Sequence, residues 1–335
     1  MYANVLNKGL FACCPPSLTH PDGSPVNIEV SAVAWNSKRL VFGSDKPIPG
    51  AQHSPVFSYY TAELIKSGEK YEDFALAEGG RHMIATTGFD RVSDRDGQKD
   101  RWNRLLVWPC SVPERVQLVE KCVRDGVPSS VQLREQFSAV LGGAPYFKVE
   151  GLASVPGVEG SGDPLLLFGV REVGKDHENF QYVAKIVGVP YRIGPDDSMT
   201  LTGDFEVMYE FDPMQAKEVR FQVGLSSLEW DPMGRRLHLL TSFEVEGENG
   251  GNTVGAYLWS LSLEDLHAGR KPQLIMDKQK GCAFEFQNKA EGIAVLPGGV
   301  LFIAYDPDSS LELPDQTKEK RQKNEAPYTL LELLE

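Results

Sequence analysis

The chain lacks any long apolar run and is poor in basic residues for its length. Its 335 residues include 34 Lys and Arg against 47 Asp and Glu, which gives a formal net charge of −13 at pH 7. An acidic surface does not neutralise phosphates, so we expect no binding to nucleic acid or to an anionic lipid surface. No apolar stretch approaches the length that crosses a bilayer, so we also expect no membrane span. A small anionic substrate stays open, because a local basic pocket can lie within an acidic protein.

Cysteine is also scarce, and the usual catalytic signatures are absent. The five cysteines are an odd number without metal-ligand spacing, which favours free thiols. The first residues, MYANVLNKGLFACCPPSL, hold one Lys and a poor apolar core, unlike a secretory signal. We therefore expect a cytoplasmic protein, or a secreted one if the sequence is a mature form. No HExxH, G-x-S-x-G, P-loop or dinucleotide-binding phrase occurs.

What the sequence does contain is one phrase that occurs five times. The stretch KAEGIAVLPGGVLFIAYDPD (289–308) alternates apolar residues, turns at Pro-Gly-Gly, and continues as a second apolar run. Each phrase begins with a small hydroxyl or acidic residue, has a polar turn, and ends in a second apolar strand. The other four begin with SAVAWNSKRLVFGSDK at Ser31, EDFALAEGGRHMIATTGFD at Glu72, EGLASVPG at Glu150 and SSLEWDPMGRRLHLLTS at Ser226.

The spacing of these phrases predicts an all-β fold, a five-bladed β-propeller. Their starts are 41, 78, 76 and 65 residues apart, too irregular for a solenoid but typical of blades with variable outer strands. We expect a single domain over 1–335, with six blades as the alternative count. The run YTLLELL (328–334) gives the last blade a third strand. An N-terminal segment should complete the ring, because an open sheet edge exposes unpaired backbone groups.

One segment, 111–143, predicts a helical hairpin inserted between blades two and three. Ser111 to Glu114 is a capping signature, and valines follow at helical spacing up to Gly126. A second helix should begin at Ser130, with Leu133 and Phe137 on one face. This hairpin is either a packed decoration or a lid or docking element for a protein partner.

The first residues of the five inner strands predict a cation site. Equivalent positions of successive blades face each other across the central channel, which brings together Ser31, Glu72, Glu150, Ser226 and Glu291. Carboxylates 4 to 6 Å apart repel by about 3 to 4 kcal/mol per pair at an effective dielectric near 20. An oxygen-only ring suits Ca²⁺, whereas Zn²⁺ prefers His or Cys. The alternative is that these side chains bind backbone groups of neighbouring blades.

These strand starts resemble a known family, the calcium-activated nucleotidases, which are secreted five-bladed apyrases. The likeness rests on EVSAVAWNSKRLVFGSDK (29–46), LSSLEWDPMG (225–234) and KAEGIAV (289–295). It implies a central calcium held at the five strand starts. The phrases EGLASVPG, LLLFGVRE and KAEGIAV also resemble a bacterial propeller family related to phytase-like esterases, over about 150–310.

Charged residues at the strand ends are the candidates for catalysis. The resemblance places Asp45 and Lys46 where the nucleotidases have an Asp-Arg pair, and Arg171 where they have paired arginines. We expect catalytic roles for Asp45, Asp90 and Arg171. We expect substrate binding by Lys46, Arg91 and Asp306. The predicted function is a cation-dependent hydrolase of a small phosphorylated or ester substrate. The alternative is a non-enzymatic interaction module with a structural cation.

Overall fold

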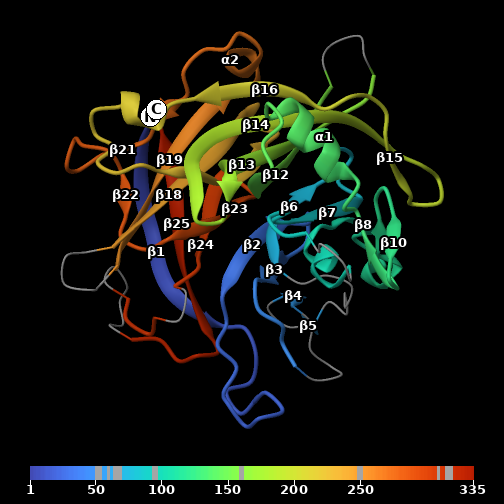
Figure 1. The fold of residues 1–335 in the computed structure, drawn as a ribbon. Helices are drawn as coiled ribbons and strands as arrows, with labels where there is room; N and C mark the ends of the chain where they lie inside the picture. The colour runs from blue at the N-terminus through green and yellow to red at the C-terminus, as the bar shows by residue number, and fades with distance from the viewer. Residues whose placement is uncertain are drawn as a thin grey trace.

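The computed structural model describes residues 1–49, 55–58, 61–62, 70–92, 97–157, 162–246, 252–307, 310–313 and 320–335. In these ranges the strands form five sheets of four or five strands and one two-stranded hairpin. The five sheets, here called blades one to five, surround a common axis (Figure 1). The predicted five-bladed β-propeller is therefore confirmed.

Each blade begins with its innermost strand and continues outward. Blade one contains β2 (Val30–Trp35), β3 (Leu40–Ser44), β4 (Val56–Ser58) and β5 (Thr61–Ala62). Blade two contains β6 (Tyr71–Leu76), β7 (His82–Thr87), β8 (Leu105–Pro109) and β9 (Gln117–Leu118). Blade three contains β12 (Tyr146–Val155), β13 (Leu165–Asp176), β14 (Asn179–Ile193), β15 (Met199–Leu201) and β16 (Glu206–Phe211). Blade four contains β17 (Gly224–Asp231), β18 (Arg236–Glu246), β19 (Asn252–Ser262), β20 (Gln273–Leu274) and β22 (Glu285–Phe286).

Blade five joins the two ends of the chain. It contains β23 (Ala290–Leu296), β24 (Val300–Tyr305), β25 (Glu325–Leu334), β1 (Tyr2–Ala12) and β21 (Met276–Asp277). Strand β1 pairs antiparallel with β25 along its whole length, so the termini lie side by side (Figure 1). The N-terminal segment thus closes the ring as expected and covers the edge of β25.

The hydrophobic core is divided into five parts, one at each interface between neighbouring blades. Each cluster of buried apolar residues combines side chains of two consecutive blades, and the fourth combines blades five and one. The innermost strands contact one another in chain order, and β23 contacts β2. This closed cycle of packing places the starts of all five inner strands around one axis.

The expected helical hairpin at 111–143 is half wrong. Its first helix is absent: the described residues there form a 3-10 turn (Pro113–Arg115), β9, and a hairpin of β10 (Cys122–Arg124) and β11 (Val127–Ser129). Asp125 and Gly126 make the two-residue turn, with φ of 49° and 80°. An Asp-Gly pair with both φ positive is a strong hairpin signal, and β-branched valines favour strands over helix. The second helix forms as α1 (Leu133–Val140), with Leu133 and Phe137 buried.

The remaining helices in the described ranges are short. They are α2 (Leu263–His267) and two more 3-10 turns, Gln98–Trp102 and Pro213–Gln215. Among the described helices none has the length and hydropathy needed to cross a membrane. The five cysteines are all free thiols.

Candidate functional site

The predicted strand starts occupy one structural position in all five blades. Each lies at a β-bulge, where the pairing of the first and second strand of its blade shifts by one residue. A bulge re-aims a side chain without interrupting the sheet. All five are buried, and we call them the strand heads: Ser31, Glu72, Glu150, Ser226 and Glu291. The repeat of the bulge confirms the alignment of the five phrases.

The two serine heads connect adjacent blades. Ser31 Oγ donates a hydrogen bond to the carbonyl of Tyr71, and Ser226 Oγ donates to the carbonyl of Ala290 at 3.0 Å. In both cases the acceptor is the residue before the glutamate head of another blade. These contacts match the alternative reading of the heads, in which they bind neighbouring backbone.

The three glutamate heads are paired with side-chain cations. Arg171 Nη1 lies 2.9 Å from Glu150 Oε2, and Lys289 Nζ lies 2.8 Å from Glu291 Oε1. Lys148 Nζ contacts Glu150 and lies 3.8 Å from Glu72 Oε1. We call these three glutamates and their three cationic partners the head cluster: Glu72, Glu150, Glu291, Lys148, Arg171 and Lys289.

Charges in the head cluster act on each other across blades. Burial would lower the pKa of Lys148, but Glu150, Glu72, Glu172 and Glu291 together raise it well above its usual value. Burial would raise the pKa of Glu150, yet Arg171 and Lys148 hold it at about 2. The charges of all three glutamate heads thus act on one lysine, in keeping with strand heads that meet around the axis.

Glu72 differs from the other two glutamate heads. Burial raises its pKa well above the usual value; the charges of Glu150 and Asp45 add to this rise, and those of Lys148 and Lys70 act against it. The surroundings thus favour the protonated form of Glu72 and the ionised form of Glu150. Two carboxyls whose pKa values shift in opposite directions within one cluster are typical of acid-base sites.

The residues of the head cluster do not fit the expected calcium. Each glutamate head already has a lysine or arginine nitrogen within ion-pair distance. Calcium prefers carboxylate oxygens that are not neutralised by cations. Among the described residues no group of three or more Asp, Glu, His and Cys has the geometry to hold a metal. Calcium binding at the five strand heads thus stays a prediction that this arrangement does not favour.

A short sequence pattern explains the pairing, and the sequence analysis missed it. Each glutamate head follows a lysine by two residues: Lys70 precedes Glu72, and the phrases KVEG and KAEG carry Lys148 and Lys289. Residues two apart on a strand point to the same side of the sheet. The two serine heads have no lysine at this position. In blades three and five, K-x-E is thus the signal for a glutamate that pairs with the lysine two residues before it, whereas Lys70 pairs with Asp45.

Asp45 and Lys46 follow β3 at the edge of the head cluster. We call this edge, which also holds Asp90 and Arg91, the rim. Lys46 Nζ lies 3.0 Å from Glu29 Oε2 and 3.3 Å from Asp45 Oδ2, while Lys70 Nζ lies 3.7 Å from Asp45 Oδ1. The side chain of Lys46 is 51% exposed, so a ligand can reach it. The structure thus places Asp45 close enough to Glu72 for its charge to act on that carboxyl, while Lys46 pairs with Glu29 and Asp45.

Asp90 and Arg91 lie on the same rim, after β7. Arg91 Nε lies 3.2 Å from Asp90 Oδ2, and the other oxygen, Oδ1, is buried without a hydrogen-bond partner among the described residues. A Cβ atom added at Gly88 would lie 3.0 Å from Glu72 Oε1 and 3.4 Å from Asp90 Oδ1. The two carboxyls therefore flank one point, and glycine there leaves room for both.

Arg171 and Asp306 are buried rather than on the rim. The side chain of Arg171 is 3% exposed, and its Nη1 also donates to Ser242 Oγ at 2.6 Å. Asp306 is 5% exposed and helps Glu291 to raise the pKa of Lys289 against the effect of burial. Both predicted residues thus belong to the charged cluster at this end, but neither is freely accessible.

A further carboxyl on the axis was missed by the sequence analysis. Asp73, next to a strand head, is fully buried, and its Oδ2 accepts hydrogen bonds from Leu152 N at 2.9 Å, Leu228 N at 3.1 Å and Ser227 Oγ at 3.0 Å. It joins the inner strands of blades two, three and four. The equivalent positions hold Ala32, Gly151, Ser227 and Gly292, so a single charged residue in the aligned phrases was the available signal.

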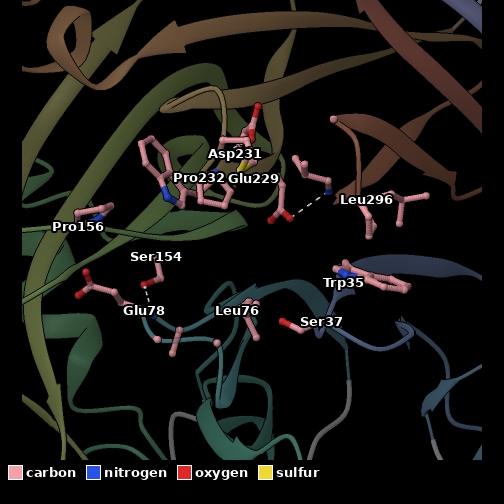
Figure 2. A pocket seen from close by; sticks show the side chains of 18 of the residues that line it. Trp35, Ser37, Leu76, Glu78, Ser154, Pro156, Glu229, Asp231, Pro232 and Leu296 are labelled. Carbon is pink, nitrogen blue, oxygen red and sulfur yellow. Dashed lines mark hydrogen bonds between the residues drawn. The ribbon is translucent and has the colours of Figure 1, made fainter.

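A cavity of about 480 Å³ lies at the opposite end of the axis, among the turns that connect the first and second strands. All five blades contribute to this turn pocket. Trp35, Leu76, Trp230 and Leu296 supply apolar surface, and Glu229 supplies a buried carboxyl. Figure 2 shows Glu229 directed into the pocket, with Trp35 and Leu296 to one side and Ser154 to the other.

Comparison with known proteins finds only distant structural likenesses. No known family model matches the chain, and no curated protein matches it. A structure of a GH43 β-1,3-galactosidase is 12% identical, with coverage of 97% of this chain and 96% of that one and a TM-score of 0.43. A GH62 α-L-arabinofuranosidase from Podospora anserina is 8% identical, with 96% coverage of each chain and a TM-score of 0.38. A nidogen/laminin complex is 10% identical over 89% and 86% of the chains, with a TM-score of 0.39.

These matches are too distant to carry an argument about activity. The resemblance to calcium-activated nucleotidases and phytase-like esterases is not confirmed by them and stays a prediction.

Proposed function

We propose that the head cluster and its rim form the catalytic site of a hydrolase for a small phosphorylated substrate, with small esters as the second substrate class. The observation that supports this most is the pair of carboxyls beside Gly88. Glu72 is a buried acid whose pKa is raised by its surroundings, and Asp90 carries a buried oxygen without a hydrogen-bond partner in the described part of the chain. A proton donor next to a proton acceptor is what general acid-base hydrolysis requires.

The two carboxyls have complementary roles in this proposal. Asp90 accepts a proton from water while the water oxygen forms a bond to the phosphorus or carbonyl centre. Glu72 donates its proton to the leaving oxygen as the ester bond breaks. One water is consumed, and a proton passed from Asp90 back to Glu72 restores the site. Both carboxyls flank Gly88, which makes this return short.

Rim cations support binding of an anionic substrate. Lys46 and Arg91 are about half exposed, and each has a carboxylate neighbour that keeps it positioned. Lys70 lies between the rim and Glu72 and adds a third positive charge. Asp45, held by Lys46 and Lys70, is a second candidate for orienting the water, as the sequence predicted. Three cations around two working carboxyls favour a phosphate over a neutral ester.

Arg171 and Asp306 have a different role here from the one predicted. Because Arg171 is buried and bonded to Glu150 and Ser242, we assign it as a positioning residue that keeps Glu150 ionised. Asp306 helps to keep Lys289 protonated, because its charge raises the pKa of that lysine against the effect of burial. No step of the proposed reaction uses calcium, because Glu150 and Glu291 already have lysine or arginine partners.

A direct test is a hydrolysis screen on the purified chain. The substrates are p-nitrophenyl phosphate, nucleoside diphosphates and p-nitrophenyl acetate, each with chelator and with added Ca²⁺ or Mg²⁺. We expect turnover of a phosphorylated substrate, lost by about 100-fold or more in Glu72→Gln and Asp90→Asn. Glu206→Gln, an exposed carboxyl on β16, is the matched control and should keep full activity.

Two outcomes would contradict the proposal. One is the absence of turnover for every substrate class, which would support the alternative that the propeller is a binding protein. The other is turnover that survives both Glu72→Gln and Asp90→Asn, which would place the chemistry elsewhere.

A further inference from the structure

The turn pocket is a second site, at the other end of the axis from the head cluster. Its volume of about 480 Å³ lies in the range of small-molecule sites, about 300 to 1,000 Å³. The walls come from the inner-strand turns of all five blades, so their spacing is fixed by the packing of the propeller. A pocket supported by five packed elements is preformed, which lowers the cost of binding.

The charge of the pocket has one sign. Among the described residues that line it, Glu78, Glu229 and Asp231 are acidic and none is Lys, Arg or His. Asp231 Oδ1 accepts from Met233 N at 2.9 Å, and its pKa is lowered because hydrogen bonds from His238 and from the turn outweigh burial. Asp231 is thus a fixed negative charge at the rim. An acidic cavity in a chain of net charge −13 disfavours anions.

Two indoles give the pocket its apolar surface. Trp35 follows from blade one and Trp230 from blade four, and both are only partly buried. The face of an indole is the aromatic surface that attracts cations best, and it also binds methyl and methylene groups. Leu76 and Leu296 extend this apolar wall.

Glu229 is the counter-charge aimed into the pocket. It is 8% exposed, its Oε1 accepts from Val295 N at 3.2 Å, and Figure 2 shows the carboxyl pointing toward the cavity while Asp231 is turned away. Burial raises its pKa to about 8, and Asp231 adds to the effect. A buried carboxyl of this kind is poorly matched to a pocket without cations, and a bound positive group would favour its ionised form.

We propose that the turn pocket binds a small organic cation, a substituted ammonium with apolar substituents, against the indoles of Trp35 and Trp230 with Glu229 as its counter-ion. A neutral sugar and a purely apolar molecule are the competing occupants. Neither makes use of the Glu229 carboxyl in a pocket whose described lining residues include no Lys, Arg or His. The site is independent of the head cluster, so the proposed hydrolysis does not decide it.

The test is calorimetric titration of the full chain with choline and with 3,3-dimethylbutan-1-ol, which has the same shape without the charge. We expect choline to bind at least about tenfold more tightly than the alcohol. Glu229→Gln and Trp35→Ala should each weaken choline binding by about tenfold or more. Glu206→Gln, which does not line the pocket, should leave choline binding unchanged. Trp35→Phe serves if the alanine variant does not fold, with a smaller loss expected.

Three results would overturn this inference. Equal binding of choline and the alcohol would make the pocket an apolar site. Binding of methyl glucoside but not of choline would make it a sugar site. Choline binding that is unchanged in the folded Glu229→Gln variant would show that Glu229 is not the counter-ion.

Discussion

Replacing Asp73 tests how the inner strands are held together. Its Oδ2 accepts from two backbone amides, Leu152 and Leu228, and from the hydroxyl of Ser227, across three blades. In Asp73→Ala these two amides and Phe74 N, which donates to Oδ1, stay buried and lose their acceptor, and each such loss costs about 1 to 3 kcal/mol. The Ser227 hydroxyl can rotate and is left out of the sum. We therefore expect the free energy of unfolding to fall by about 6 kcal/mol.

Asp73→Asn gives a graded comparison. The asparagine oxygen can keep all three bonds of Oδ2, and its amide group replaces the oxygen that accepts from Phe74 N at 2.9 Å. Only one donor then lacks an acceptor, so the expected cost is about 1 to 3 kcal/mol. Asp176→Ala is the control: its Oδ1 accepts from Glu178 N and Asn179 N in an exposed turn, where water replaces it.

The assay is equilibrium unfolding in urea, followed by tryptophan fluorescence. The expected order of stability is wild type and Asp176→Ala, then Asp73→Asn, then Asp73→Ala. If Asp73→Ala stays within about 1 kcal/mol of wild type, the three-blade junction contributes little and the reasoning is refuted. If asparagine costs as much as alanine, the charge of Asp73 and not its acceptor geometry is responsible.

Three further predictions concern stability. The pKa of Glu229 in the folded protein, about 8, exceeds its ordinary value of 4.5. Its contribution to the free energy of unfolding is therefore complete below pH 4.5 and is lost as the pH rises through 8. Glu229→Gln should remove this loss of up to about 4 kcal/mol, so the melting temperature of the variant should change less between pH 5 and pH 8. Lys289→Met leaves Glu291 buried without its lysine and should lower the free energy of unfolding in urea by about 3 to 5 kcal/mol. Adding Glu291→Gln to the same chain should restore part of this loss. An unchanged stability of Lys289→Met would show that this ion pair is not needed. Removal of residues 1–12 exposes the edge of β25 and should abolish cooperative melting and promote aggregation, whereas a sharp transition of the shortened chain would contradict closure by β1.

The number of blades could be predicted because the inner hairpin of each blade is local in sequence. Alternation of apolar residues around a Gly or Pro turn specifies two strands within about twenty residues, and five such phrases specify five inner hairpins. Their heads converge because a propeller places equivalent positions around one axis. The bulge at each head, from Ser31 to Glu291, follows from the same repeat.

Other features depend on competition that a periodic pattern does not resolve. Valines at 116, 119 and 123 fit a helical face, but Asp125-Gly126 turns the chain as a hairpin and β-branching favours strands. The charge balance of the head cluster was legible as K-x-E, yet the glutamates were read without the lysines beside them. The turn pocket brings Trp35 next to Glu229, 194 positions apart in the sequence, which only the packing of the blades determines.

The central claim is that the glutamate heads meet on the axis and are neutralised by side chains of the same protein. Thermal melting of the chelator-treated chain, with and without millimolar Ca²⁺, tests it most directly. If calcium binds, a free concentration of a hundred times its Kd would add about 2.7 kcal/mol to the free energy of unfolding, which raises the melting temperature by several degrees. The account predicts the same melting temperature in both conditions. A clear rise with Ca²⁺ that is lost in Glu150→Gln would contradict it and restore the calcium ring.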